Sequence, residues 1–148
     1  MSEAKRIADQ LRRAVRGPAW HGDSVEEILA GVTAPQASRH PIANAHSIHE
    51  LVLHMAAWAE IALERIVKGE IRPIADEENF PAPGEWNADQ ERFFAASDRL
   101  AAHIDGMSDT ELDFVLPPRQ QVVYHLLHGI VQHHLYHAGQ LVLLKKLV

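Results

Sequence analysis

SIHELVLHMAAW, residues 47–58, opens with the clearest helix start in the chain. Ser47 and Glu50 form a capping-box pattern, in which each side chain satisfies a free backbone N–H at the helix start. Apolar residues then recur at helical spacing with His54 among them, and Gly69 is suited to end the helix. The stretch therefore predicts a long helix that carries one imidazole on its buried side.

Helical spacing also appears on both sides of this stretch. We expect further long helices over about residues 3–16, 85–104 and 119–147, and a short one over 25–30. The stretch around Pro35 and Pro41 should be extended, and residues 70–85 should form a long loop. Strand signals are scarce, because no Asn-Gly or Asp-Gly hairpin and no sustained alternation occurs. These features predict an all-α fold, a four-helix bundle with an extra short helix in the first connection.

The length and composition of the chain argue against a nucleic-acid-binding, membrane or secreted protein. The 148 residues suit one domain spanning residues 1–148, and the net charge of −6 offers no basic footprint for nucleic acid. No apolar run approaches the roughly 20 residues that span a bilayer, so no membrane association is expected. Residues 1–17 lack the apolar core of a signal peptide, and cysteine is absent. We therefore expect a cytoplasmic protein without thiol chemistry of its own.

Histidines are concentrated in HHLYHAGQ, residues 133–140, within the last expected helix. His133 and His137 are four residues apart, about 40° on a helical wheel, so their imidazoles project from one face. The same wheel places both on the inward stripe, with His125 and His134 at its flanks and His128 pointing away. Two neighbouring buried imidazoles each need a polar partner, because an unpaired buried polar group is destabilising.

A shared metal ion would satisfy both imidazoles, and His54 from a facing helix would complete a three-histidine site. Zinc is bound in this way at catalytic sites, and nickel also accepts imidazole. The alternative is that His54 is a hydrogen-bonded core residue and that the pair is a chance spacing. A His-x-x-x-His pattern on a helix is only moderately specific, and the glutamate of the HExxH motif is missing.

Other polar residues near the pair are weaker candidates for a role in chemistry. Gln140 lies on the face of His133 and His137 and suits a hydrogen bond to a ligand imidazole or to substrate, or plain packing at the bundle end. No acidic general base stands out, which leaves His49, His134 and Gln140 as candidate catalytic groups. A loop at Trp20 and His21 either lies over the site entrance or anchors the chain.

Two motifs together resemble the DinB-like metalloprotein family. They are Ser-Ile-x-Glu-Leu-Val-x-His-x-Ala-x-Trp at residues 47–58 and His-x-x-x-His-x-Gly-Gln at residues 133–140. The resemblance implies a four-helix bundle with a three-histidine site for a divalent ion, usually zinc or nickel, and carries the ligands onto His54, His133 and His137. Many relatives have arginine where this chain has Ala138, which removes an anion contact.

The resemblance also implies a range of functions. Some relatives transfer or isomerise substrates with low-molecular-weight thiols, some resemble hydrolases, and many are homodimers. We therefore expect a metal-dependent enzyme acting on a small molecule, either a thiol-dependent S-transferase whose thiol cosubstrate comes from outside or a hydrolase. The alternative is a non-catalytic, dimeric bundle that binds a metal or a small ligand.

Overall fold

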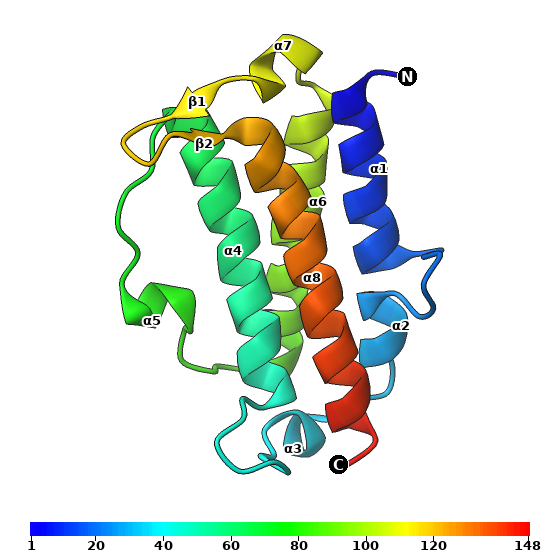
Figure 1. The fold of residues 1–148 in the computed structure, drawn as a ribbon. Helices are drawn as coiled ribbons and strands as arrows, with labels where there is room; N and C mark the ends of the chain where they lie inside the picture. The colour runs from blue at the N-terminus through cyan, green and yellow to red at the C-terminus, as the bar shows by residue number, and fades with distance from the viewer.

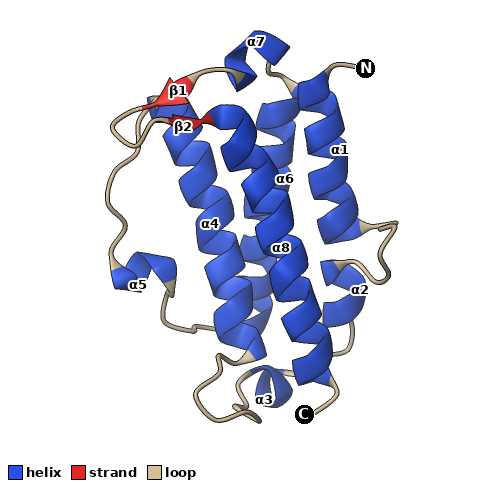
Figure 2. Ribbon diagram, in the orientation of Figure 1, coloured by secondary structure: helices blue, strands red, loops and turns tan.

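Four long helices form the body of the protein in a computed structural model that describes all 148 residues. They run nearly side by side (Figure 1) and are α1 (Glu3–Arg16), α4 (Ile48–Lys68), α6 (Trp86–Asp105) and α8 (Val123–Lys145). Almost everything outside them is short helix or loop (Figure 2). The prediction of an all-α, four-helix bundle is confirmed.

Local capping explains where the long helices begin and end. The Ser47 hydroxyl accepts from Glu50 N while the Glu50 carboxylate accepts from Ser47 N, so the predicted capping box of α4 is present. Gly69 ends the helix with φ 70°, a left-handed conformation that glycine adopts without steric strain. The α6 helix starts differently, because the Glu85 carboxylate accepts from the first free N–H groups.

Two connections contain more helix than expected. The first holds α2 (Val25–Leu29) and also α3 (Ala34–Ala37), where an extended stretch was predicted. Thr33 and Gln36 form a capping box around α3, a signal that the prolines nearby obscured. The predicted loop after α4 contains the single turn α5 (Asp76–Asn79), and α7 (Asp109–Leu112) follows α6.

A small hairpin corrects the predicted start of the last helix. Strands β1 (Val115–Leu116) and β2 (Gln121–Val122) pair antiparallel, with Val115 opposite Val122. The helix therefore begins at Val123 and not near residue 119, because Val123 N still donates to Phe114 O across the hairpin. The prolines at 117 and 118 lie in the turn, where their missing N–H groups break no ladder bond. Figure 1 shows the hairpin lying across the upper ends of α4 and α8.

The apolar core runs the length of the bundle. Leu11, Met55, Phe93, Leu100 and Leu127 are among its fully buried side chains. Helix α8 packs against both α4 and α1, so a wide arc of its surface is buried and not one narrow stripe. None of the helices combines the length and the apolar character that crossing a membrane would require.

Candidate metal centre

Three imidazoles meet between α4 and α8. His54 comes from the middle of α4, and His133 and His137 come from successive turns of α8. His133 Nε2 lies 2.9 Å from His54 Nε2 and 3.1 Å from His137 Nε2. One nitrogen from each ring lies within 4.8 Å of the others, an arrangement that can hold a metal ion. The structure therefore brings together the residues that the spacing and the resemblance single out.

Hydrogen bonds on the far side of two rings determine where their protons are. His54 Nδ1 is 2.7 Å from Asn79 O, and His137 Nδ1 is 2.5 Å from Gln140 Oε1. A carbonyl oxygen only accepts, so each Nδ1 carries the hydrogen. In the neutral rings the lone pairs of both Nε2 atoms then point toward His133. This is the tautomer in which a histidine binds a metal through Nε2.

The two ring nitrogens of His133 are not fully satisfied by hydrogen bonds within the protein. His133 Nδ1 is buried and has no hydrogen-bond partner, while its Nε2 faces two lone pairs. A single N–H there can point at only one acceptor well. A cation among the three Nε2 atoms would accept all three lone pairs, with the proton of His133 then carried on Nδ1. Zinc–nitrogen bonds of about 2.0–2.1 Å in a tetrahedral site place the nitrogens about 3.3 Å apart, so the donor set fits with small adjustments.

Burial keeps the three rings neutral. Desolvation lowers the pKa of His54 and of His137 below the ordinary value. It lowers the pKa of His133 to about 3, with a smaller contribution from the neighbouring rings. Because only neutral imidazole binds a metal, the lone pairs remain available throughout the physiological pH range.

The segment after α4 covers the centre from one side. The Phe80 ring stacks on His54 at 4.1 Å between centroids, and His46 stacks on Phe80 at 4.0 Å. Asn79 accepts from His54 through its backbone and from Trp58 Nε1 through its side chain, at 2.8 Å. Asn79 and Phe80 of the segment 70–85 therefore line one side of the centre. Asn79 and Phe80 were not identified from the sequence, because no spacing rule connects them to the histidines.

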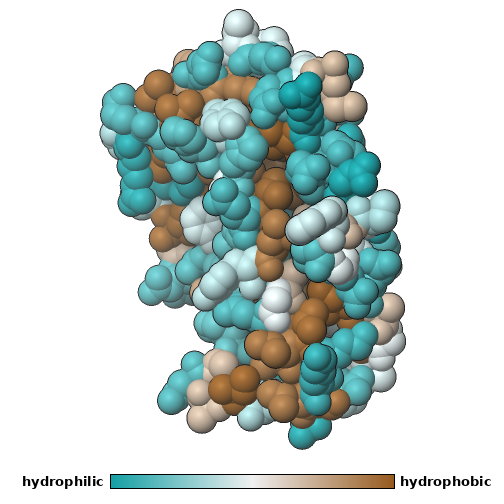
Figure 3. All heavy atoms as spheres, turned by 45° about the vertical axis from the view of Figure 1, so that its right-hand side comes forward, coloured by the Kyte–Doolittle hydropathy of each residue, from teal (hydrophilic) through white to brown (hydrophobic).

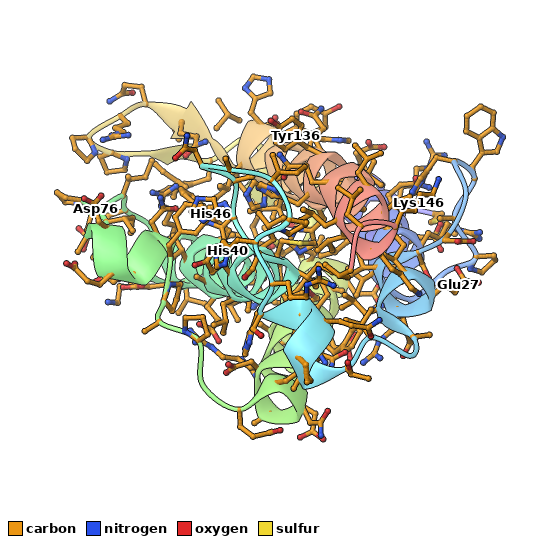
Figure 4. All side chains as sticks on the ribbon, turned by 90° about the horizontal axis from the view of Figure 1, so that it is seen from below. Glu27, His40, His46, Asp76, Tyr136 and Lys146 are labelled. Atoms are coloured by element: carbon orange, nitrogen blue, oxygen red, sulfur yellow. The ribbon has the colours of Figure 1, made fainter.

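A cavity of about 370 Å³ opens beside the centre, on the side of His137. Its lining is largely apolar, with the polar groups of Tyr136, Gln140 and His46 at its edges. Seen from below in Figure 4, His46 lies near the start of α4 and Tyr136 lies on α8. A larger cavity of about 530 Å³, between α1 and α8, includes none of the three histidines and lies away from the site.

The other candidate catalytic histidines do not join this group. His49 lies five residues before His54, about 140° around the helix, and its Nε2 bonds Asp89 Oδ2 at 2.7 Å. His134 is 0% exposed, packs against Phe93 on α6, and has no partner for either ring nitrogen. The wheel placed His134 at a flank and was wrong, because the wide buried arc of α8 is centred nearer His134.

Of the two alternatives for the loop at Trp20 and His21, the structure excludes a position over the site entrance. Trp20 is fully exposed, and both residues lie beside the larger cavity between α1 and α8. Of the remaining α8 histidines, His125 is exposed, and His128 is half-buried near Tyr124 and Glu3. Gln140, in contrast, makes the hydrogen bond to a candidate ligand that its position on the helix allowed.

Comparison with known proteins agrees with these features. Searches of curated proteins and of solved structures find no match to the chain. A family model of the DinB superfamily matches residues 19–141, which include α4, most of α8 and all three histidines. Since this match covers most of the sequence, the chain belongs to the DinB superfamily.

Proposed function

We propose that His54, His133 and His137 bind one divalent metal ion, zinc or nickel, and that the protein is a metal-dependent enzyme. The observation that carries the proposal is the convergence of three Nε2 atoms, two of them with lone pairs fixed by Nδ1 hydrogen bonds. No carboxylate lies among them to neutralise a proton, so a metal ion is the natural shared partner. Three protein ligands also leave at least one position open for a ligand from solution.

The chain's own residues would orient and shield this position. Asn79 and Gln140 hold two rings in the metal-binding tautomer, while Phe80 and Trp58 exclude water from one side. A divalent ion bound there would supply Lewis acidity, which lowers the pKa of a water or thiol that it binds. The cavity beside His137 would receive the apolar part of a small substrate.

The surroundings favour an S-transferase with an external thiol over a hydrolase. Water needs a base to remove its proton, but the nearby carboxylates are occupied: Glu50 by His40 and His46, and Asp89 by His49. A thiol has an ordinary pKa of about 8.5 and loses its proton with much less help. Since the chain has no cysteine, the thiol would come from a low-molecular-weight cosubstrate.

The same lack of a base supports a second function, a non-catalytic protein that binds a metal or small ligand. Either function is compatible with a homodimer. Large apolar side chains are exposed on α8 at Leu135, Tyr136 and Leu143, and just beyond its end at Leu147. Figure 3 shows brown, hydrophobic residues gathered in patches on this side of the molecule. We propose that a second copy covers this face, which light scattering coupled to gel filtration would test.

The experiment that tests the function begins with untagged protein purified without added metal. Metal analysis should find about one equivalent of zinc or nickel for each chain. The cobalt-substituted protein should then change its absorption spectrum when a small thiol is added. His54→Ala should abolish cobalt binding, and His46→Ala should retain it. A cobalt spectrum that responds to no thiol or anion would favour the non-catalytic function. Absence of metal binding would overturn the metal-dependent enzyme and the metal-binding form of the second function.

A further inference from the structure

Arg65 differs from the other arginines in having no acidic partner although it is buried. Seven of the ten arginines form ion pairs with carboxylates, namely Arg6, Arg12, Arg13, Arg16, Arg72, Arg92 and Arg99. The unpaired ones are Arg39, Arg65 and Arg119. Arg39 and Arg119 are exposed to water, whereas Arg65 is only 8% exposed. A buried charge without a counter-ion is unfavourable and calls for an explanation.

The guanidinium of Arg65 lacks hydrogen-bond partners as well. Its Nε is buried and unpaired, while the two terminal nitrogens donate to no protein atom and are not fully buried. The adjacent Glu64 is engaged by Arg72 at 3.0 Å and by Lys68 at 2.6 Å. Burial, and then the positive charges of Arg119 and Arg72, lower the pKa of Arg65 below its ordinary value. Positive charge therefore exceeds negative charge around this side chain, in a chain whose net charge is −6.

Arg65 is also close to the three-histidine centre. Its guanidinium carbon lies 5.3 Å from the centre of the Trp58 ring, and that tryptophan lies 6.0 Å from the His133 ring. Arg65 belongs to the last turns of α4, beneath the hairpin of Figure 1 whose turn carries Arg119. Gly129, one turn before His133 on α8, leaves open space, since a Cβ there would meet no atom within 4 Å.

We propose that Arg65, assisted by Arg119, binds the carboxylate of a small-molecule ligand. The terminal guanidinium nitrogens provide the paired N–H donors that a carboxylate accepts, and the Trp58 ring holds the guanidinium in place. A single carboxylate supplies the negative charge that no acidic residue supplies. This inference rests on the proposed function only in taking the ligand to be its substrate, whose orientation the bound carboxylate end would fix.

Binding of acetate and of succinate tests this site directly through tryptophan fluorescence. The Trp20→Phe background removes the emission of the fully exposed tryptophan and leaves Trp58 and the buried Trp86. We expect saturable binding that weakens about tenfold or more in Arg65→Met, since hydrogen bonds to a charged group contribute about 1.5–3 kcal/mol. Arg39→Met removes the same charge from an exposed site and should bind as the background protein does.

Two further measurements separate this site from the metal centre and from a structural role. Succinate binding should persist after chelation and in His133→Ala, whereas binding lost in both would place the anion on the metal and overturn the proposal. Arg65→Met should melt no lower than the background protein, because removing a buried charge that has no counter-ion offsets the loss of the cation–π contact with Trp58. A clear fall in melting temperature, equal affinities in Arg65→Met and Arg39→Met, or binding of inorganic phosphate but not of carboxylates would each contradict it.

Discussion

The histidines at the start of α4 and those of the α4–α8 centre differ in what faces their ring nitrogens. His40 and His46 contact the Glu50 carboxylate at 3.1 and 3.2 Å, and His49 contacts Asp89. His54, His133 and His137 face one another, with no carboxylate among them. An imidazole beside a carboxylate can carry its own proton, whereas three clustered imidazoles repel added protons and share a metal ion instead. Position relative to acidic residues thus separates structural histidines from candidate ligands.

Removing one imidazole ring from each group should give the largest difference in metal affinity. His133→Ala deletes the nitrogen that lies close to both others, so metal affinity should fall by about a hundredfold or more. His46→Ala leaves the three nitrogens in place and should change affinity less than threefold. Isothermal titration with zinc measures both. Similar affinities in the two variants would show that the metal binds elsewhere.

Removing the metal should lower the melting temperature of proteins in which the α4–α8 centre is intact. A ligand at about 100 times its dissociation constant stabilises the folded state by about 2.7 kcal/mol, which raises the melting temperature by several degrees in a chain of this size. Chelation should therefore lower the melting temperature of the wild type and of His46→Ala. The bundle should stay folded, because its core does not depend on the centre. Unchanged melting of protein shown to be metal-loaded would exclude a tight site.

His49→Ala should do the reverse, reducing stability without reducing metal affinity. The variant leaves Asp89, which is half-buried, without its imidazole partner and opens space beside Trp86. A loss of about 1–3 kcal/mol in the free energy of unfolding is expected, measured by urea denaturation. Zinc affinity should match the wild type. A weakened zinc site with normal stability would mean that His49 serves the centre after all.

Gln140→Met tests the hydrogen bond that fixes the tautomer of the His137 ring. Methionine preserves the length of the side chain but cannot accept the hydrogen of His137 Nδ1. Zinc affinity should fall about tenfold, less than for loss of a ligand, because the ring stays but its tautomer is no longer fixed. Gln132, exposed on the same helix, provides the matched control as Gln132→Met. Equal affinities in the two variants would contradict the role of Gln140.

The smallest expected effect concerns a carboxylate that is paired with basic residues other than histidine. Hydrogen bonds from Arg72 and then Lys68 lower the pKa of Glu64 from 4.5 to about 2. Its pairing therefore stabilises the fold above about pH 4.5 and is lost as pH falls toward 2. Because the Glu64 side chain is partly exposed to solvent, which screens the pair, the contribution is about 0.5 kcal/mol. Glu64→Gln should flatten this part of the acid unfolding curve, and an unchanged curve would assign no stability to the pair.

Local signals predicted the helices well. Capping at Ser47 and Gly69 depends on residues within one turn, and the spacing of His133 and His137 follows from helix geometry alone. The position of His54 on the buried side of a facing helix made it a candidate third ligand, and the family resemblance assigned that role to it. Hairpin residues 115–122 were missed because a strand of two residues has no period to detect.

Long-range features were beyond sequence reasoning for a different reason. The acceptor for His54 is a backbone carbonyl, which every residue possesses, so nothing marks Asn79 as the partner. The absence of a counter-ion for Arg65 likewise depends on which carboxylates the fold brings near. The burial of His134 could be predicted only if the packing of α8 against two helices at once was known. Such properties follow from packing between elements and not from any one segment.

The bond between His54 and the backbone of residue 79 has a consequence for how the protein can vary. Because the acceptor is main chain, the tautomer of His54 depends on the length of the segment after Gly69 more than on its composition. Substitutions along that segment can preserve the centre as long as the carbonyl arrives at the same place. One inserted or deleted residue would move the carbonyl by roughly 3 Å along the chain and release the ring. Homologues with diverged loop sequences but equal loop lengths should therefore keep the same imidazole orientation.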